Sequence, residues 1–301
     1  MSRPRTLIVA LTLALVTLPL AASAVPTRLA EGAPAKDPFA CAENPLLAGA
    51  QIIPVVPTNH PVASPCGGIR PGSALTIKAG SFDFMYCTLA FIVTDGTDLY
   101  AATAGHCVDP SLGVPGPGQR VSALGVPGTF GTVAYQWCED QAVNGGCGAG
   151  KDFALIRIDA DKHSYVNRAM CHWGAPTGGL FTAKDQTLRT IQHFGWGMFL
   201  GEASGVMVTV GNPATQAREG LGLDFSEGYT YAFVHTPAIS GDSGSGVLVG
   251  DFDVAVYGAL ANPQALGVLT HITVGGFAVV QRLDVSLAKA GVEMGKTFTL
   301  Y

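Results

Sequence analysis

The chain has 301 residues, of which 48% are hydrophobic and 13% are charged. That composition excludes a disordered chain or a coiled coil, and the length suffices for one large all-β domain or two small ones with a buried core. Seventeen lysines and arginines against 22 aspartates and glutamates give a formal net charge of -5, without a basic run, which argues against nucleic acid as a partner.

The N-terminus predicts an export signal. Arg3 and Arg5 precede an apolar run over residues 7–22, and a small-residue motif ends at Ala24, where we expect cleavage. Pro19 and this motif disfavour the alternative of a retained membrane anchor. We therefore expect a signal peptide over 1–24 and a secreted, extracellular protein without membrane contact once the signal is removed.

Residues 25–71 predict an N-terminal extension or propeptide. The segment is rich in proline, alanine and small polar residues and shows little strand or helix periodicity. Cys41 and Cys66 lie in it, which indicates that at least part of the segment is tied to itself or to the rest of the protein. The sequence leaves open whether it is removed.

The seven cysteines fit disulfides better than a metal site, because no C-x-x-C pair occurs and the protein is expected to be exported. We expect no metal and no cofactor. Cys138 and Cys147 flank an Asn-Gly-Gly turn, which favours a short-loop disulfide. Cys87 and Cys107 lie on two expected neighbouring strands and are paired as well. The remaining cysteines, Cys41, Cys66 and Cys171, then compete for one bond, and spacing does not decide which stays free.

From residue 72 onward, short apolar runs alternate with turn residues, which predicts antiparallel β-barrels or a sandwich. The expected strands span 74–79, 88–94, 99–104, 119–124, 129–135, 153–158, 187–194, 205–210, 229–235, 246–249, 253–260 and 266–273. One helix is expected late in the chain, over 280–290, with apolar residues at helical spacing and Gly291 as its stop.

Ser243 is the candidate nucleophile. It lies in a glycine-rich loop over 241–246, just before an apolar run. Glycine at 241 and 244 lets the backbone turn tightly and aim the N–H groups of Gly241 and Ser243 at one point, as an oxyanion hole requires. The plainer interpretation is an ordinary Gly/Ser loop between strands.

His106 and Asp152 supply the other two chemical groups. His106 follows a strand and precedes Cys107, whose disulfide would hold the imidazole within reach of a nucleophile. Asp152 begins a strand and can orient the imidazole and stabilise its protonated form. The competing acids are more typical of turns and are Asp109, Asp159 and Asp161. Five other histidines are interpreted as surface or core residues, namely His60, His163, His172, His193 and His235.

Together these segments resemble the chymotrypsin-like (trypsin-type) serine proteases, and among them secreted bacterial members such as streptogrisin. The resemblance rests on 87–93, 103–107, 152–156 and 241–245, in the order His, Asp, Ser. It implies two six-stranded antiparallel barrels over 72–291, the first about 72–165 and the second about 166–280, then the helix of about 280–290 and a C-terminal tail over 292–301. It also implies a Ser-His-Asp triad, an acyl-enzyme intermediate and peptide substrates. We expect a monomer.

The resemblance places four residues at the pocket for the substrate side chain: Pro237, Thr270, His271 and Ile272. Pro237 stands where trypsin-like members carry a carboxylate, which disfavours cleavage after Lys or Arg. Ile272 stands where many members carry glycine. His271 is near the position of a histidine used by glutamate-specific relatives, but its register is shifted. A small or neutral apolar side chain is therefore favoured over glutamate.

The main hypothesis is a secreted serine endopeptidase. One alternative is a non-catalytic binding protein on a protease fold, suggested only by the altered pocket at Ile272. Another is an esterase that uses the same triad. Labelling by a fluorophosphonate that depends on Ser243 separates the first two, and a comparison of ester with peptide substrates addresses the third.

Overall fold

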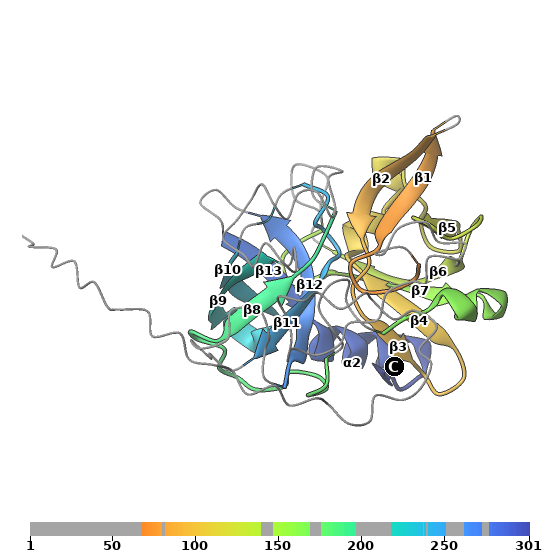
Figure 1. The fold of residues 1–301 in the computed structure, drawn as a ribbon. Helices are drawn as coiled ribbons and strands as arrows, with labels where there is room; N and C mark the ends of the chain where they lie inside the picture. The colour runs from red at the N-terminus through yellow and green to blue at the C-terminus, as the bar shows by residue number, and fades with distance from the viewer. Residues whose placement is uncertain are drawn as a thin grey trace, which may run out of the picture.

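The computed structural model describes residues 68–79, 82–139, 147–168, 176–196, 218–236, 238, 240–250, 262–272 and 277–301. Over these residues the protein consists of two β-domains that lie side by side, with one α-helix that runs along both (Figure 1). The predicted all-β fold with a C-terminal helix is thereby confirmed. Some predicted features lie outside the described residues, namely the signal peptide, most of the extension, the strands over 205–210 and 253–260, Pro237, Cys41, Cys66 and Cys171.

The first domain is an eight-stranded antiparallel sheet in the order β14-β3-β4-β7-β6-β5-β1-β2. Its strands are β1 Ala74–Ala79, β2 Phe82–Thr88, β3 Ile92–Thr94, β4 Leu99–Thr103, β5 Arg120–Ala123, β6 Gly131–Cys138, β7 Asp152–Ile158 and β14 Thr299–Leu300. All residues of β4 are buried, and β6 alternates between buried and more exposed positions. Such patterns are expected for strands that enclose a core.

The chain curls this first sheet, which has eight strands where a six-stranded barrel was expected. β2 and β3 are successive parts of one bent strand, joined by Leu89–Phe91. Leu89 N donates to Ser73 O (2.7 Å) beside β1, whereas Ala90 N donates to Ala102 O (2.7 Å) in β4. The bent strand therefore changes partner from β1 to β4 within two residues. The sequence predicted only part of this arrangement, as a single strand over 88–94.

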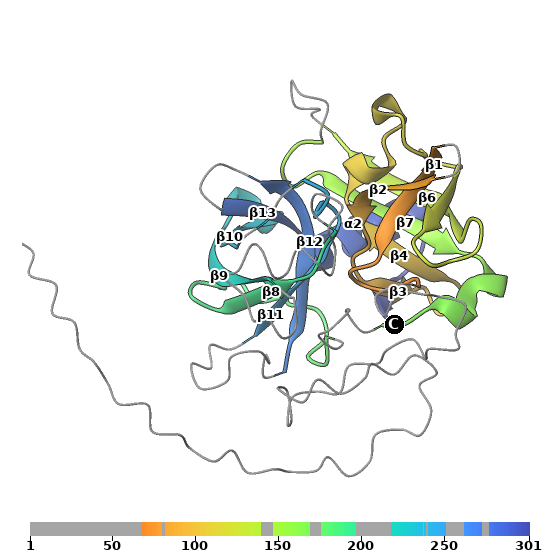
Figure 2. The same cartoon turned by 45° about the horizontal axis from the view of Figure 1, so that its top comes forward.

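The second domain is a closed barrel in the order β10-β13-β12-β11-β8-β9. Its strands are β8 Thr190–His193, β9 Arg218–Phe225, β10 Tyr231–His235, β11 Gly246–Gly250, β12 Gln264–Ile272 and β13 Phe277–Arg282. Figure 2 shows this barrel beside the first domain, with β12 on the side nearer to that domain. Its core is a separate cluster of buried apolar side chains contributed by all six strands.

The helix lies further along the chain than the sequence predicted. It spans α2 Leu283–Met294, while Val280 belongs to β13, so the expected start at 280 is wrong. The expected stop at Gly291 is also wrong, because the left-handed C-cap is Gly295 (φ 67°). A Cβ at Gly291 would come within 2.7 Å of Lys296 O. Glycine at this position therefore lets the chain after the helix pass close to the helix.

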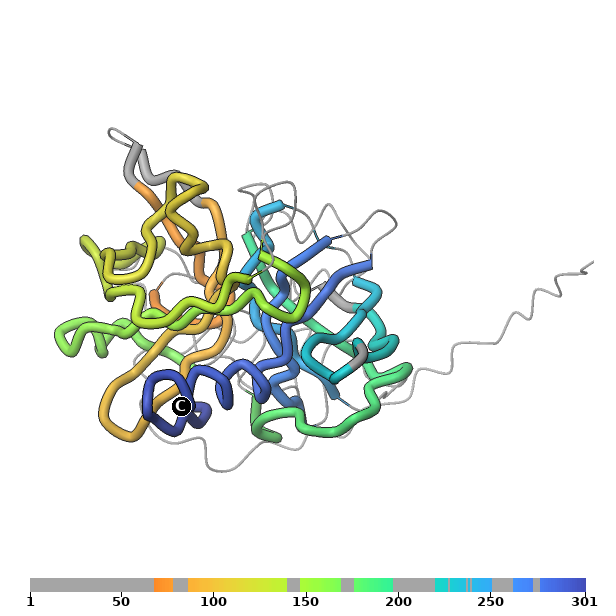
Figure 3. Tube along the Cα trace, turned by 180° about the vertical axis from the view of Figure 1, so that it is seen from behind, coloured from red at the N-terminus to blue at the C-terminus, as the bar shows by residue number. Residues whose placement is uncertain are grey.

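The last residues form part of the first domain and not a separate tail. α2 leaves β13 of the second barrel and runs under the first, as Figure 3 shows from behind. Lys296 Nζ binds the Asp95 carboxylate and lies 2.5 Å from Tyr100 Oη, and β14 pairs with β3. The helix and the C-terminus therefore connect the two domains. Among the described residues, no helix has the length and apolarity to cross a membrane.

Candidate active site

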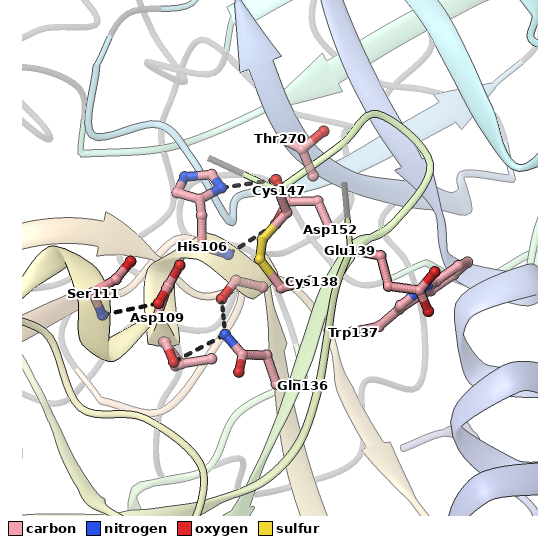
Figure 4. Close-up of a disulfide and its surroundings, with 12 residues drawn as sticks. His106, Asp109, Ser111, Gln136, Trp137, Cys138, Glu139, Cys147, Asp152 and Thr270 are labelled. Carbon is pink, nitrogen blue, oxygen red and sulfur yellow. Dashed lines mark hydrogen bonds and ion pairs between the residues drawn. A yellow bond between two sulfur atoms is a disulfide. The ribbon is translucent and has the colours of Figure 1, made fainter. Parts of the chain in front are cut away.

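Neighbouring strands of the first barrel bring His106 and Asp152 together. His106 lies in a 3-10 turn over Gly105–Val108 that follows β4, and Asp152 is the first residue of β7. β4 and β7 pair with Thr103 opposite Ala154, so the end of one strand lies beside the start of the other. Figure 4 shows the imidazole directed at the Asp152 carboxylate.

Both oxygens of the Asp152 carboxylate bind His106. Oδ2 lies 2.8 Å from His106 Nδ1, and Oδ1 accepts the backbone N–H of His106 at 2.9 Å. Asp152 is fully buried, whereas the His106 side chain is 18% exposed. A carboxylate accepts only, so Nδ1 carries a proton and Nε2 of the neutral ring is left as the basic nitrogen.

The turn that carries His106 is held closely against β6 and β7. A Cβ at Gly105 would come within 2.6 Å of Trp137 O and 2.9 Å of Phe153 N, so no larger residue fits there without a shift of backbone. The side-chain amide of Gln136 donates to Gly105 O (2.9 Å) and Val108 O (3.1 Å) (Figure 4). These contacts fix the imidazole relative to the carboxylate.

The pKa of His106 is raised above its ordinary value of 6.5. Burial is the largest single influence and lowers the pKa, but the charge of Asp152, its hydrogen bond to the ring and the charge of Asp109 together outweigh burial. The carboxylate therefore favours the imidazolium, which is the form that a general base reaches after it accepts a proton.

Ser243 lies where the second barrel meets the turn that carries His106. Ser243 O accepts the N–H of Thr88 (2.8 Å), and Cys107 Sγ lies 3.6 Å from the same oxygen. Gly244 has φ 89°, and a Cβ there would come within 2.2 Å of Thr88 O and 2.3 Å of Thr103 Oγ1. The backbone of the Ser243 loop thus packs on residues that adjoin His106.

The Ser243 loop carries the two backbone N–H groups expected to form the oxyanion hole, those of Gly241 and Ser243. Gly241 adopts φ 101°, a conformation that favours glycine. Within the part of the chain that the structure describes, neither Gly241 N nor Ser243 N donates to a backbone carbonyl. The neighbouring Asp242 is fully buried, and a Cβ at Gly195 would come within 2.6 Å of its Oδ1, which agrees with a structural role for this acid.

The competing aspartates have turn or surface roles, as predicted. Asp109 caps a 3-10 helix and accepts the N–H of Ser111 (2.9 Å). Asp159 forms a bidentate ion pair with Arg120. The side chain of Asp161 is 74% exposed. Asp109 acts on His106 through its charge, which raises the pKa of the imidazole.

Both predicted disulfides are present, Cys87–Cys107 and Cys138–Cys147. The first joins β2 to the residue after His106, and the second closes the loop before Asp152 (Figure 4). The sulfurs of the first lie within 4.8 Å of a His106 nitrogen, the only such grouping of metal-binding types among the described residues. Disulfide sulfurs are not thiolates, so the grouping does not fit a metal.

The predicted pocket residues on β12 differ in what they offer to a substrate. Thr270 is buried, and its hydroxyl oxygen lies 3.2 Å from Val279 O. Both ring nitrogens of His271 have partners, because Nε2 lies 2.7 Å from Cys147 O and Nδ1 lies 2.9 Å from Thr270 Oγ1. Ile272 is 37% exposed at the end of the strand. His271 therefore joins β12 to the disulfide loop.

Thr88 is a residue of this site that the sequence did not single out. It is fully buried between the two barrels, and its hydroxyl donates to Gly241 O (2.9 Å). Its position directly after Cys87 was the signal available, because a residue next to a disulfide at His106 must lie close to the same site.

Several solved structures are similar to this chain at low sequence identity. No known family profile matches the sequence, and no curated protein matches it either. Among solved structures, Protease A of Thermobifida fusca is 19% identical, with a TM-score of 0.46, over 77% of this chain and 98% of that chain. A serine protease specific for glutamic acid, described as using a histidine triad in substrate binding, is 17% identical, with a TM-score of 0.46, over 77% of this chain and 100% of that chain. A chymotrypsin of Cellulomonas bogoriensis is 18% identical, with a TM-score of 0.42, over 77% and 98%.

Proposed function

We propose that this chain, which has the two-barrel fold of the chymotrypsin-like serine proteases, is a secreted serine endopeptidase with Ser243, His106 and Asp152 as its triad. The observation that supports this proposal most is the buried Asp152 carboxylate bound to His106 Nδ1 at 2.8 Å, next to the loop of Ser243. A buried acid that fixes one imidazole nitrogen and leaves the other for a serine is the arrangement that acyl transfer requires.

In the proposed reaction, His106 Nε2 takes the hydroxyl proton of Ser243 as Oγ attacks the carbonyl carbon of the scissile bond. The tetrahedral oxyanion is bound by the N–H groups of Gly241 and Ser243. His106 then gives the proton to the leaving amine, and the C–N bond breaks to leave an acyl-enzyme. Water, deprotonated by the same imidazole, attacks the ester carbonyl and releases the acid together with free Ser243.

Asp152 stabilises the imidazolium that forms at each of these steps. Its charge and its hydrogen bond raise the pKa of His106 against the opposing effect of burial. Since Asp152 is fully buried, its field at the ring is little screened by solvent. The backbone N–H of His106, bound to Oδ1, keeps the carboxylate in the plane where Oδ2 reaches Nδ1.

We propose peptide substrates with a small or neutral apolar side chain at the cleaved position. Among the described pocket residues, Thr270 and Ile272 carry no charge, and His271 has both ring nitrogens engaged within the protein. A glutamate side chain in such a pocket would lose its hydration, and the His271 nitrogens that could bind it already have Cys147 O and Thr270 Oγ1 as partners.

We propose secretion through the signal over 1–24. Two disulfides support an oxidising compartment, because the cytosol keeps thiols reduced.

The proposal is tested with the mature protein and a biotinylated fluorophosphonate. We expect one label per molecule, no label in Ser243→Ala, and full labelling in the matched control Ser245→Ala, whose buried hydroxyl lies 3.5 Å from His193 Nδ1. Cleavage of casein by the same preparation, measured before the fluorophosphonate is added, distinguishes a peptidase from an esterase. An unlabelled wild-type protein that is folded would contradict the proposed triad, and ester hydrolysis without casein cleavage would favour the esterase.

A further inference from the structure

We infer that Thr88 is a positioning residue that sets the oxyanion hole and ties the nucleophile loop to the strand of the general base. This inference rests on the proposed function. Thr88 ends β2 of the first barrel, is fully buried, and contacts the second barrel at several points through short hydrogen bonds.

Every hydrogen-bonding group of Thr88 has a partner. Its N–H donates to Ser243 O (2.8 Å), and its hydroxyl donates to Gly241 O (2.9 Å). The same hydroxyl accepts the N–H of Trp196 (3.0 Å), and Thr88 O accepts the hydroxyl of Thr103 (2.8 Å). One hydroxyl proton and the oxygen lone pairs are enough for these bonds, so no group of Thr88 is left unsatisfied.

The two bonds to the loop hold the peptide units on either side of the Ser243 N–H. Gly241 O belongs to the peptide that joins 241 to 242, and Ser243 O belongs to the peptide that joins 243 to 244. Between them lies the single peptide 242–243, which carries the Ser243 N–H. Fixing both neighbours leaves that peptide only a rotation about the axis through its two Cα atoms. The Cβ atoms of Asp242 and Ser243 restrict this rotation sterically, so the direction of the N–H has little freedom. Thr88 therefore aims an oxyanion donor without contacting the substrate.

Thr88 also joins the loop to the strand that leads to His106. Thr103 ends β4 and donates its hydroxyl to Thr88 O, and the chain then passes through Ala104 and Gly105 to His106. The absence of a side chain at Gly244 lets the loop approach Thr88 O and Thr103 Oγ1. A displacement of Thr88 would therefore alter the separation of nucleophile and base as well as the direction of the donor.

Three variants of the full chain test the inference. Thr88→Val removes the hydroxyl with little change of shape, and Thr88→Ser keeps the hydroxyl. Tyr86→Phe is the matched control on the same strand, because the buried Tyr86 Oη has no hydrogen-bond partner among the described residues. Active sites are titrated with the fluorophosphonate, so that kcat is expressed per active molecule. For all variants, kcat and KM are measured with one peptide ester as substrate.

We expect Thr88→Val to lower kcat about 10- to 100-fold, because a shift of the order of 1 Å at a reacting centre costs up to about 100-fold. KM should change less than about threefold, Thr88→Ser should recover most of kcat, and Tyr86→Phe should match the wild type. If Thr88→Val keeps kcat, or lowers only the titrated fraction of active molecules, Thr88 has no positioning role. A wild type that fails to react with the fluorophosphonate contradicts the proposed function itself, which separates the two failures.

Discussion

Asp152 binds His106 twice, through the backbone N–H and through Nδ1 of the ring, at 2.9 and 2.8 Å. One carboxylate therefore fixes both where the residue lies and how its ring is turned. Gly105 makes this possible, because a side chain there would come within 3.2 Å of Asp152 Oδ1 as well as against the backbone of β6 and β7. The position of the ring thus depends on the strand pairing of the first barrel.

Replacing Asp152 by asparagine should lower kcat by about 10⁴-fold with little change in KM, because the amide can donate to Nδ1 and favours the wrong tautomer. The measurement is steady-state hydrolysis of a peptide ester per titrated active site. Asp161→Asn is the control, since the Asp161 side chain is 74% exposed beside Lys162. A decrease in Asp152→Asn no larger than that in Asp161→Asn would contradict the role of Asp152.

The acid side of the pH profile of kcat/KM should have its midpoint above 6.5, because the base must be neutral and the pKa of His106 is raised above that value. In Asp152→Asn the midpoint should move to lower pH, since the charge that raises the pKa is gone. A wild-type midpoint below 6.5 would contradict this prediction.

The same shift predicts how stability depends on pH. A folded pKa above the unfolded value means that the pairing contributes stability below about pH 6.5, and that this contribution is lost as the pH rises through the folded pKa. Thermal unfolding of Ser243→Ala, which avoids self-digestion, should therefore show a fall in stability over that range that is absent from the protein carrying both Ser243→Ala and Asp152→Asn.

The sequence predicted the fold class and the two disulfides better than it predicted the contacts between distant segments. The cysteines of both disulfides lie close together in the sequence, 20 and 9 residues apart, so short local patterns were enough to predict their pairing. The predicted start of the helix was too early because Val280 and Leu283 are apolar for different reasons. Val280 belongs to β13, and Leu283 begins α2. The roles of Thr88 and His271 depend on contacts between residues far apart in the chain, which no local pattern contains.

Gly244→Ala should destabilise the protein strongly. A left-handed φ costs about 1–2 kcal/mol for a residue with a Cβ, and overpacking against Thr88 O and Thr103 Oγ1 adds about 1–3 kcal/mol. Gly113→Ala is the matched control, because Gly113 has φ 77° but nothing within 4 Å of its Cβ position. Urea denaturation measures both, and equal losses would contradict the close packing of the Ser243 loop.

Removing the Cys87–Cys107 disulfide with a double serine variant should cost about 3 kcal/mol of stability, given its sequence separation of 20. Activity per folded molecule should fall as well, since Cys107 adjoins His106 and its sulfur lies 3.6 Å from Ser243 O. The corresponding variant of Cys138–Cys147, whose separation is 9, provides the comparison. Unchanged thermal stability and turnover without Cys87–Cys107 would show that this disulfide supports neither folding nor the site.

His271→Leu should lower stability without changing which peptides are cleaved. The ring joins Cys147 O at 2.7 Å to Thr270 Oγ1 at 2.9 Å. Thr270 Oγ1 also has Val279 O as a partner, but Cys147 O would lose the donor that His271 supplies, at a cost of about 1–3 kcal/mol. His235→Leu is the control, because His235 is exposed on β10 and its ring contacts only Phe277 among the described rings. Profiling of a peptide library with both variants should give the wild-type order of preferred side chains. A selective loss of cleavage after glutamate in His271→Leu alone would instead show that this histidine binds the substrate, and that the proposed neutral pocket is wrong.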